Sequence, residues 1–412
     1  MTNQLFTNPG VLHRLHAGPL GSYVDPFATR LSEQGYAKFS IKYRIRLVAV
    51  LSHWMHRRRI GIRELDEQTN VKFLKYLRRK RRIQRGDMPT LRMLLEYLRE
   101  SDVIPTPAPG VDDSEIDRIV HGFANYLLQE RRLSQASLNN YLPVVRRFLE
   151  KRFGTQPVLL GKIDQTDILH FVLRNVRNLS RGRAKLMVTA LRSFFRFLQL
   201  QGDINTDLAV AVPTVANWRF ATLPKWIAPA QVEHLLKSCD QSTLAGQRNY
   251  TILLLLARLG LRSGEIVTMT LDDIDWEAGE IKVGGKNRRQ DRLPLPKDVG
   301  EALAKYLRYG RPRCSTRQVF VRMRAPLHGF MNSSAIYSMV RRSFDHAGIH
   351  PIQRGPHILR HSLATNMLRK GASLGEISEI LRHRSICTTQ IYAKVDLEAL
   401  RKIAQPWPGG EK

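Results

Sequence analysis

The sequence predicts a mainly α-helical protein with one small β-sheet, arranged as two helical regions followed by a mixed domain. Apolar residues recur three and four positions apart over most of the chain, as on one face of a helix. Two proline-containing segments, 103–113 and 212–224, divide the chain into three parts. Between residues 272 and 296, apolar and polar residues instead alternate and glycines mark turns, which is typical of short strands.

The first region spans residues 1–105. Prolines and glycines interrupt residues 1–40, so we expect this stretch to be mostly irregular. From Ile41 the apolar pattern becomes helical, and further helices are expected at Asn70–Lys80 and Met88–Glu100. The runs HRRRIG and YLRRKRRIQR are strongly basic, and each either contacts phosphate or forms a solvated face.

The second region, residues 114–212, predicts four amphipathic helices that form a small bundle, with Ser114 and Ser134 as N-caps. Its sequence can be aligned with that of the first region. YRIRLVAVLSHW matches YLPVVRRFLEKR, and TLRMLLEYLRESDVI matches TALRSFFRFLQLQGDI, at an offset close to one hundred residues. A duplication and a chance likeness between two amphipathic bundles both explain this match, and both readings stay open.

The third region, residues 225–405, begins with helices expected at Pro229–Cys239 and Gln247–Leu259, the second ending at Gly260. A hairpin or three-stranded sheet follows. Further helices are expected at Lys297–Tyr306, Ser333–Ala347, His361–Arg369, Leu374–Leu381, Thr388–Tyr392 and Asp396–Ile403.

Charge identifies the class of partner. The chain carries 66 Lys and Arg against 36 Asp and Glu, a formal net charge of +30, which favours a polyanion such as nucleic acid. The longest apolar run, Ile252 to Ala257, is too short to span a bilayer, so no membrane association is expected. No export signal is apparent, and three widely spaced cysteines suit a reducing compartment. We therefore expect a cytoplasmic, nucleoid-associated bacterial protein.

Side chains suited to breaking a phosphodiester gather in the third region. The reaction needs an in-line nucleophile, cations that stabilise the charge on phosphorus, and a proton for the leaving oxygen. Paired arginines suit the second task, because each guanidinium is always charged and binds two phosphate oxygens. No carboxylate cluster has metal-ligand spacing, so we expect neither a metal nor another cofactor. The candidates are Arg262, Lys286, His357, Arg360, His383 and Tyr392.

Taken one at a time, these residues are weak evidence for a catalytic site. His357 and Arg360 stand three apart, which brings them to one face of a helix, but His56 and Arg59 have the same spacing and are interpreted as surface residues. The candidates are informative as a set, because a base, two cations and a hydroxyl group occur together in one domain.

Together the motifs resemble the tyrosine recombinase (phage integrase) family. They are LGLRSGE around Arg262, the hairpin Lys286, HILRH at 357–361, LRHRS with His383, and Tyr392. The resemblance covers about residues 225–405 and extends more weakly over 114–212, which resembles the family's helical core-binding domain. Residues 1–105 lie outside it and are interpreted as an extra region, either unrelated or a diverged DNA-binding repeat.

The resemblance implies a role for each matching position. Tyr392 would attack the scissile phosphate to form a 3′-phosphotyrosyl link, while Arg262 and Arg360 would bind the non-bridging oxygens. Lys286 would protonate the leaving oxygen, although Lys282 on the preceding strand is an alternative. His357 would assist proton transfer and His383 would bind the phosphate. Glu265 and His361 would position this cluster.

Other cations are candidate DNA contacts, although a solvated face explains each of them equally well. They are Arg181, Arg183 and Lys185 before one helix, and Arg289 and Arg292 beside the hairpin.

The sequence thus predicts a site-specific recombinase that acts on double-stranded DNA, forms a homo-oligomer, expected to be a tetramer, and serves a mobile element, with or without partner recombinases. An apolar stripe after Tyr392 (Val395, Leu397, Leu400, Ile403) is expected to dock on a neighbouring subunit. The alternatives are a catalytically inactive accessory protein and a type IB topoisomerase-like enzyme.

Overall fold

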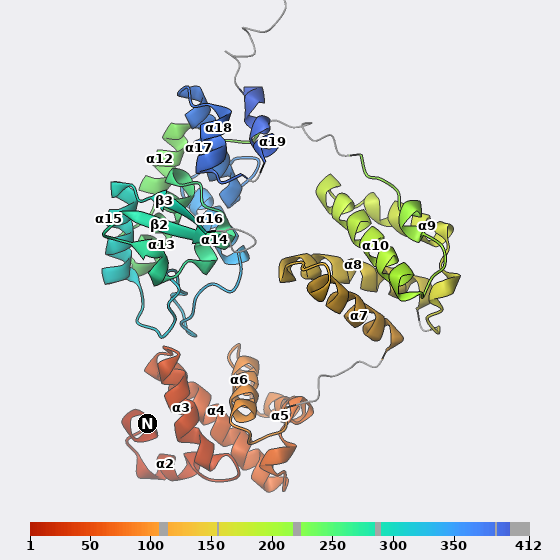
Figure 1. Cartoon of the computed structure of the whole chain (residues 1–412). Coiled ribbons are helices and arrows are strands. Elements are labelled where there is room, and N and C mark those ends of the chain that lie inside the picture. Colours follow the sequence, from red (N-terminus) through yellow and green to blue (C-terminus); the bar gives the residue numbers. More distant parts are fainter. Residues whose placement is uncertain (107–113, 155, 217–223, 285–289, 384, 396–412) are drawn as a thin grey trace, which may run out of the picture. The chain divides into compact units, whose positions relative to one another are not determined.

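A computed structural model describes residues 1–106, 114–154, 156–216, 224–284, 290–383 and 385–395 (Figure 1). The chain divides into two compact units, one formed by Thr106–Ala221 and one by Met1–Pro105 with Thr222–Lys412. The described residues are mostly helical with one three-stranded sheet, which confirms the predicted fold class. Within them, no helix is long and apolar enough to cross a membrane.

The N-terminal region is helical from its first residues, so the prediction of an irregular stretch over 1–40 was wrong. Pro9 and Pro26 stand in first helical turns, where the backbone N–H has no intrahelical partner to lose, and Pro19 lies in the turn before the 3₁₀ helix at Gly21. Pro9 is the first residue of its helix, which Asn8 caps by accepting from Gly10 N (2.9 Å) and Val11 N (3.2 Å). The elements are α1 Thr2–Leu5, α2 Pro9–Leu15, η1 Gly21–Tyr23, α3 Val24–Glu33, α4 Lys38–Arg57, η2 Ile62–Glu64, α5 Glu67–Lys80 and α6 Asp87–Glu100.

The second unit contains the four predicted helices and one further short one. Ser114 caps the first by accepting from Asp117 N (3.1 Å), as expected, whereas the hydroxyl of Ser134 lies 3.2 Å from that of Ser137. Buried phenylalanines from several helices fill the core, including Phe123, Phe148, Phe194 and Phe195. The elements are α7 Glu115–Gln129, α8 Gln135–Phe153, η3 Leu160–Lys162, α9 Gln165–Val176, α10 Arg181–Gln201 and α11 Leu208–Ala211.

The C-terminal domain packs helices around the buried helix α13, Leu244–Arg258. Its sheet has the order β1-β2-β3, both pairs antiparallel, with Ile281 opposite Leu293 and Lys282 opposite Arg292. The remaining elements are α12 Pro229–Lys237, α14 Ser263–Thr268, η4 Leu271–Asp273, β1 Ile274–Asp275, β2 Glu280–Gly284, β3 Gln290–Pro294, α15 Lys297–Lys305, η5 Tyr306–Gly310, α16 Ser334–His346, α17 Pro356–Arg369, α18 Leu374–Ile380, α19 Ile386–Thr389 and η6 Gln390–Val395.

Helix α17 begins five residues before the predicted start at His361. Pro356 is its first residue, where the fixed φ of proline favours a helix start. His357 and Arg360 therefore lie on one helix, as their spacing requires. A small separate core of Ala364, Ile377, Leu381 and Tyr392 joins this helix to the last described elements, which Figure 1 shows together in blue.

Candidate active site

Two arginines converge on one turn at the end of α18. Arg262, just before α14, donates from Nη2 to the carbonyl oxygen of Arg382 (3.1 Å). Arg360, on α17, donates from Nη2 to the carbonyl of Leu381 and from Nη1 to that of Gly260. Two guanidinium groups that stand far apart in sequence are thereby held against consecutive carbonyls, and His383 follows immediately.

A buried carboxylate ties this arrangement together. Glu265 accepts from the backbone N of Arg262 (2.7 Å) and from its Nη1 (2.8 Å). It also accepts from Nη2 of Arg382 (2.7 Å), whose side chain is only 6% exposed. Glu265 thus has the contacts of a positioning residue. Arg382 was missed by sequence reasoning, because one more arginine in LRHRS carried no signal beyond its position beside His383.

Gly260 lets the chain segment before α14 approach the turn at Leu381 closely. It has φ +57°, a conformation that favours glycine, and an added Cβ would lie 2.8 Å from a methyl group of Leu381. The predicted helix stop is therefore also a packing contact with the turn that receives the arginines.

The arginine Arg360 is deeply buried and still charged at neutral pH. Burial lowers the pKa of Arg360 to about 10, and the charges of Arg262 and Arg382 act in the same direction. Like charges held this close favour an anion between them.

The hydroxyl of Tyr392 lies inside the small core rather than at the surface. The residue is 1% exposed, and its Oη lies 2.7 Å from Nδ1 of His361. Burial raises the pKa of Tyr392 to about 12. Burial, followed by the charges of His357 and Arg360, lowers the pKa of His361 to about 4, so this ring is neutral at pH 7. A neutral imidazole accepts the phenolic hydrogen bond at Nδ1 when its proton is on Nε2.

The other two histidines flank the arginines. Nδ1 of His383 lies 2.8 Å from the hydroxyl of Thr389, and burial, with nearby arginine charges, lowers the pKa of His383 to about 4. His357 lines a cavity of about 510 Å³ together with Arg341 and Arg354. Desolvation, then the charges of Arg360 and Arg262, lowers the pKa of His357. Because this side chain is solvent-exposed, we give the arginine charges more weight than desolvation.

Comparison with known proteins agrees with this geometry. Residues 225–398 match the phage integrase family, and residues 120–202 match the N-terminal SAM-like domain of phage integrases. The chain is 45% identical to the protein y4rA of Sinorhizobium fredii, named an integrase/recombinase, over 97% of both chains. It is 31% identical to the tyrosine recombinase XerD of Listeria monocytogenes, covering 69% of this chain and 96% of XerD.

The chain belongs to the tyrosine recombinase (phage integrase) family. It is therefore an enzyme of DNA strand breakage and rejoining. Its fold is also that of the XerH recombinase in a post-cleavage complex with difH DNA (22% identity, TM-score 0.56, 75% of this chain and 92% of XerH). The Tn1549 transposon integrase in complex with transposon right end DNA has the same fold (19% identity, TM-score 0.54, 69% of this chain and 99% of the integrase chain).

One catalytic candidate of this recombinase, Lys286, lies outside the described residues, as does Arg289. The described strands bear on the alternative, Lys282. Asp291 on β3 acts electrostatically on Arg382, and it pairs with Val283 on β2. Because successive residues point to opposite sheet faces, Lys282 lies on the face opposite to Asp291. The assignment of the general acid to Lys286 stays a prediction.

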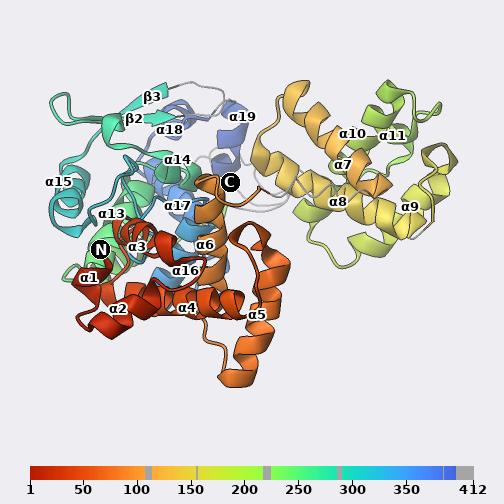
Figure 2. The ribbon, with the colours of Figure 1, turned by 90° about the horizontal axis from the view of Figure 1, so that it is seen from below.

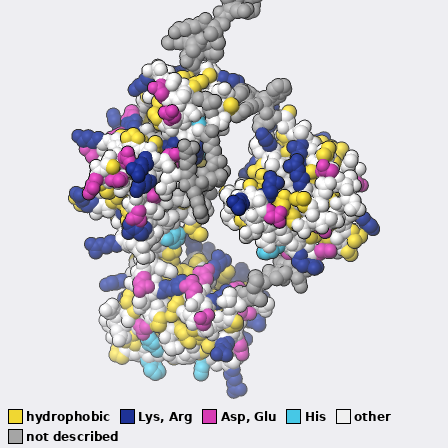
Figure 3. Space-filling model, in the orientation of Figure 1, with side chains coloured by type: hydrophobic (Ala, Val, Ile, Leu, Met, Phe, Trp, Pro, Cys, Tyr) yellow, Lys and Arg dark blue, Asp and Glu magenta, His cyan; other side chains and the backbone are white. Residues whose placement is uncertain are grey.

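The predicted DNA contacts of the recombinase are solvent-exposed where the structure describes them. Arg181, Arg183 and Lys185 occupy the first turns of α10, which Ser180 precedes as N-cap. Arg292 lies on β3, 3.4 Å from Glu280. Lys and Arg side chains are distributed over much of the face seen in Figure 3. Their exposure is compatible with phosphate contacts but does not distinguish these residues from other surface cations.

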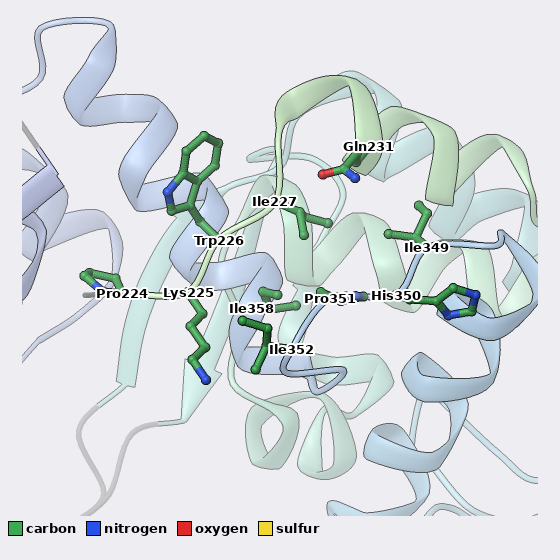
Figure 4. Close-up of a pocket in the computed structure, with 10 residues that line it drawn as sticks. All are labelled: Pro224, Lys225, Trp226, Ile227, Gln231, Ile349, His350, Pro351, Ile352 and Ile358. Carbon is green, nitrogen blue, oxygen red and sulfur yellow. The ribbon is translucent and has the colours of Figure 1, made fainter. Parts of the chain in front are cut away.

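A second hollow of about 400 Å³ lies beside α17 and is separate from the arginine cluster (Figure 4). Trp226 comes from the segment before α12, Ile352 from the segment before α17, and Ile358 from α17 itself. The guanidinium of Arg369 lies 4.1 Å from the centre of the Trp226 ring. Within the described residues, no group of three or more His, Cys, Asp or Glu is placed to hold a metal ion.

Proposed function

We propose that this recombinase cleaves double-stranded DNA by attack of Tyr392 on a phosphate held by Arg262 and Arg360. The observation that carries the proposal is the convergence of both arginines on the Leu381–Arg382 turn, directly before His383. Breaking the P–O5′ bond would leave a 3′-phosphotyrosyl link and a free 5′ hydroxyl. Attack by the 5′ hydroxyl of another strand would reverse the step, so the reaction needs no ATP or other cofactor.

The arginines retain donors for the phosphate. A guanidinium carries five N–H groups, and Arg360 uses two of them on the carbonyls of Gly260 and Leu381. The remaining donors are held in fixed directions by those bonds, and Glu265 does the same for Arg262. Preorganised donors stabilise the charge that develops on the non-bridging oxygens without reorganising during the reaction.

The proton transfers are assigned to the lysine and the histidines. Lys286 donates a proton to the departing 5′ oxygen, His357 assists, and His383 binds the phosphate. His361 positions the Tyr392 hydroxyl through the 2.7 Å contact, and Glu265 positions the arginines. Since Tyr392 is buried, attack requires this hydroxyl to leave its site in the small core.

We further propose that the enzyme acts as a tetramer on two DNA sites during integration, excision or transposition of a mobile element. The similarity to the Tn1549 transposon integrase and to y4rA supports a mobile element. The apolar stripe after Lys394 would join neighbouring subunits. Gel filtration of DNA-bound protein truncated at Lys394 tests this role, and assembly identical to that of the full chain would refute it.

The decisive experiment compares wild-type protein with Tyr392→Phe expressed in a bacterial host. Cells are lysed in strong detergent, and DNA that stays attached to the protein is sequenced. Attachment at a few loci with the wild type alone is the expected result, and it would reveal the target site. Equal and negligible recovery from both proteins would contradict the proposal and favour an accessory role. Relaxation of a single duplex without strand exchange would instead favour a topoisomerase.

A further inference from the structure

The region before the core-binding domain has the same succession of elements as that domain. In each, a long helix is followed by a 3₁₀ turn and two further helices, α4-η2-α5-α6 in the first and α8-η3-α9-α10 in the second. The 3₁₀ turns begin at Ile62 and Leu160, 98 positions apart. Unrelated amphipathic bundles often have their helices in the same order, so the turns and the core are more informative than the order of elements.

The turn into the second helix of the set is the same in both regions. Asp66 accepts from the backbone N of Thr69 (2.7 Å), and Asp164 accepts from that of Asp167 (2.8 Å). Both aspartates are N-caps and stand 98 positions apart.

The turn at the end of the set is also the same. Asp102 (φ +53°) and Gly202 (φ +80°), one hundred positions apart, both adopt a positive φ, which is uncommon for aspartate. In each turn the next residue donates its N–H back to the last turn of the helix. These bonds are Val103 N to Leu98 O (2.9 Å) and Asp203 N to Leu198 O (3.0 Å).

The buried residues correspond at nearly constant offsets. Such agreement over three helices, together with two equivalent turns, is not expected of two unrelated bundles. The buried pairs are Val24/Val120, Phe27/Phe123, Leu31/Leu127, Leu65/Ile163, Phe73/Phe171, Leu91/Leu191, Leu94/Phe194, Leu95/Phe195, Leu98/Leu198 and Ile104/Ile204.

The two regions differ in the surface of one helix. On α9, Leu169 and Leu173 are exposed. On the corresponding α5, the exposed face carries Lys72, Lys75 and Arg79, whose spacing of three and four places them in one row. At the offset of 98, Val71 is exposed like Leu169 and Arg79 corresponds to Arg177, so the difference lies at Lys75, which stands where the second region has exposed Leu173, and at Lys72, which stands where it has His170.

This row belongs to a larger basic surface formed by α4, α5 and the segment before α6. Between positions 57 and 85 the chain has twelve Lys and Arg but three acidic residues. Trp54 near the end of α4 contacts Phe73 and Tyr76 of α5 (ring centroids 5.5 and 6.2 Å), and Arg58 lies over the Trp54 ring (5.2 Å). Figure 2 shows α5 at this end of α4. The exposed cations of this stretch are Arg57, Arg58, Arg59, Arg63, Lys72, Lys75, Arg78, Arg79, Lys80, Arg82 and Arg85.

The three acidic residues lie at one end of this surface, in η2 and at the start of α5, where Lys72 acts electrostatically on Asp66. Asp66 and Glu67 stand at the N-terminal end of α5, and Glu67 pairs with Arg99 (2.8 Å). Most of these cations therefore face solvent without a carboxylate between them, and the best partner is a chain of regularly spaced anions.

We propose that residues 20–104 are a second copy of the core-binding fold and that the basic surface of α4, α5 and the segment before α6 binds the phosphates of duplex DNA. A protein of this family already holds duplex DNA as its substrate, which favours this polyanion over RNA or an acidic protein. The contact adds to those of the core-binding and catalytic domains and reads no base.

The first test measures salt dependence of binding to a 60-base-pair duplex of arbitrary sequence. Full-length Tyr392→Phe protein is the parent, so strand cleavage plays no part. Adding Lys72→Ala, Lys75→Ala and Arg79→Ala should weaken binding roughly tenfold or more at physiological salt and reduce the slope of log K against log salt by about 2 to 3. The control Lys297→Ala, Lys305→Ala and Arg308→Ala removes the same charge from exposed catalytic-domain residues. An equal effect of both triple variants, or none from the first, would overturn the proposal.

The second test uses the Tyr392→Phe parent without surface substitutions, so a folding defect of the triple variants cannot affect it. Lysine acetylation of the Tyr392→Phe protein is mapped by mass spectrometry with and without the duplex. DNA should protect Lys72 and Lys75 several-fold more than Lys297 and Lys305. Undiminished acetylation of Lys72 and Lys75 in the DNA complex would overturn the proposal. Failure of the parent to bind any duplex would count against the proposed function itself.

Discussion

The catalytic domain and the helical region before it place their functional side chains in opposite ways. In the catalytic domain, Arg360 and Glu265 are buried, and protein hydrogen bonds fix their direction. On α5 and α10, in contrast, the cations are exposed to solvent. The two helical regions that contain these helices have closely similar cores. Loss of a buried catalytic group should therefore cost most of the activity, whereas each surface cation should contribute a small and additive share.

The largest effect is expected for the two arginines. Arg262→Ala and Arg360→Ala should each lower the rate of covalent complex formation about 10²- to 10³-fold, because a preorganised donor to the phosphate is lost. Arg360→Ala should also destabilise the domain by roughly 2 to 4 kcal/mol, since it leaves two buried carbonyls without their donor. Single-turnover assays and thermal unfolding measure both effects. Arg317→Ala, which removes an exposed arginine paired with Asp272, is the control. Near wild-type cleavage by Arg262→Ala would refute its role.

The next largest effect is expected at Gly260, where the chain lies close to Leu381. Gly260→Ala forces an unfavourable φ, at roughly 1 to 2 kcal/mol, and crowds Leu381 in the turn that receives both arginines. Gly279→Ala is a matched control, because its φ is +64° and no atom lies within 4 Å of the added Cβ. We expect Gly260→Ala to reduce both stability and cleavage, and Gly279→Ala to reduce stability alone. Equal behaviour of the two variants would argue that the Leu381 contact is unimportant.

The buried histidines should make stability depend on pH. The pKa of His361 is about 4 in the folded protein and 6.5 when unfolded, so the unfolded chain binds protons first as pH falls. This contribution is complete above pH 6.5 and is lost progressively towards pH 4, by up to a few kcal/mol. His361→Gln should flatten the pH dependence of the unfolding temperature in that range. Exposed His350→Gln is the comparison, and identical curves for the two variants would contradict the assignment.

The smallest effects are expected on the helical surfaces. Arg183→Ala in the core-binding domain and Arg85→Ala, 98 positions earlier, should each weaken binding to arbitrary duplex DNA a few-fold and lower the salt slope by about 1. Both substitutions should leave the unfolding temperature unchanged, because both side chains are exposed. A slope change for Arg183→Ala alone would restrict DNA contact to the core-binding domain and exclude the basic surface of the N-terminal region.

Much of this organisation follows from sequence. The helical period, the alternating strands and the glycine stop at Gly260 predicted most of the described elements after Ile41 to within about five residues, because each depends on local chemistry. The helix expected at Asp396–Ile403 lies outside the described residues. The prolines of 1–40 led to a wrong prediction, since Pro9 starts a helix as readily as it ends one. The contact of Arg382 with Glu265 and the burial of Tyr392 could not be predicted. The contact depends on packing between segments more than a hundred residues apart. The burial depends on a small core that leaves no distinctive sequence pattern around the tyrosine.

The enclosed position of Tyr392 has a consequence for the cell. A chain with a net charge of +30 will settle on chromosomal DNA at many sites that are not its target. Because the proposed nucleophile is 1% exposed and bonded to His361, we expect such encounters to leave the chromosome intact. Substitutions that loosen this enclosure, such as Leu381→Ala, should reveal themselves by DNA damage and slow growth of the host, even where the target sequence is absent.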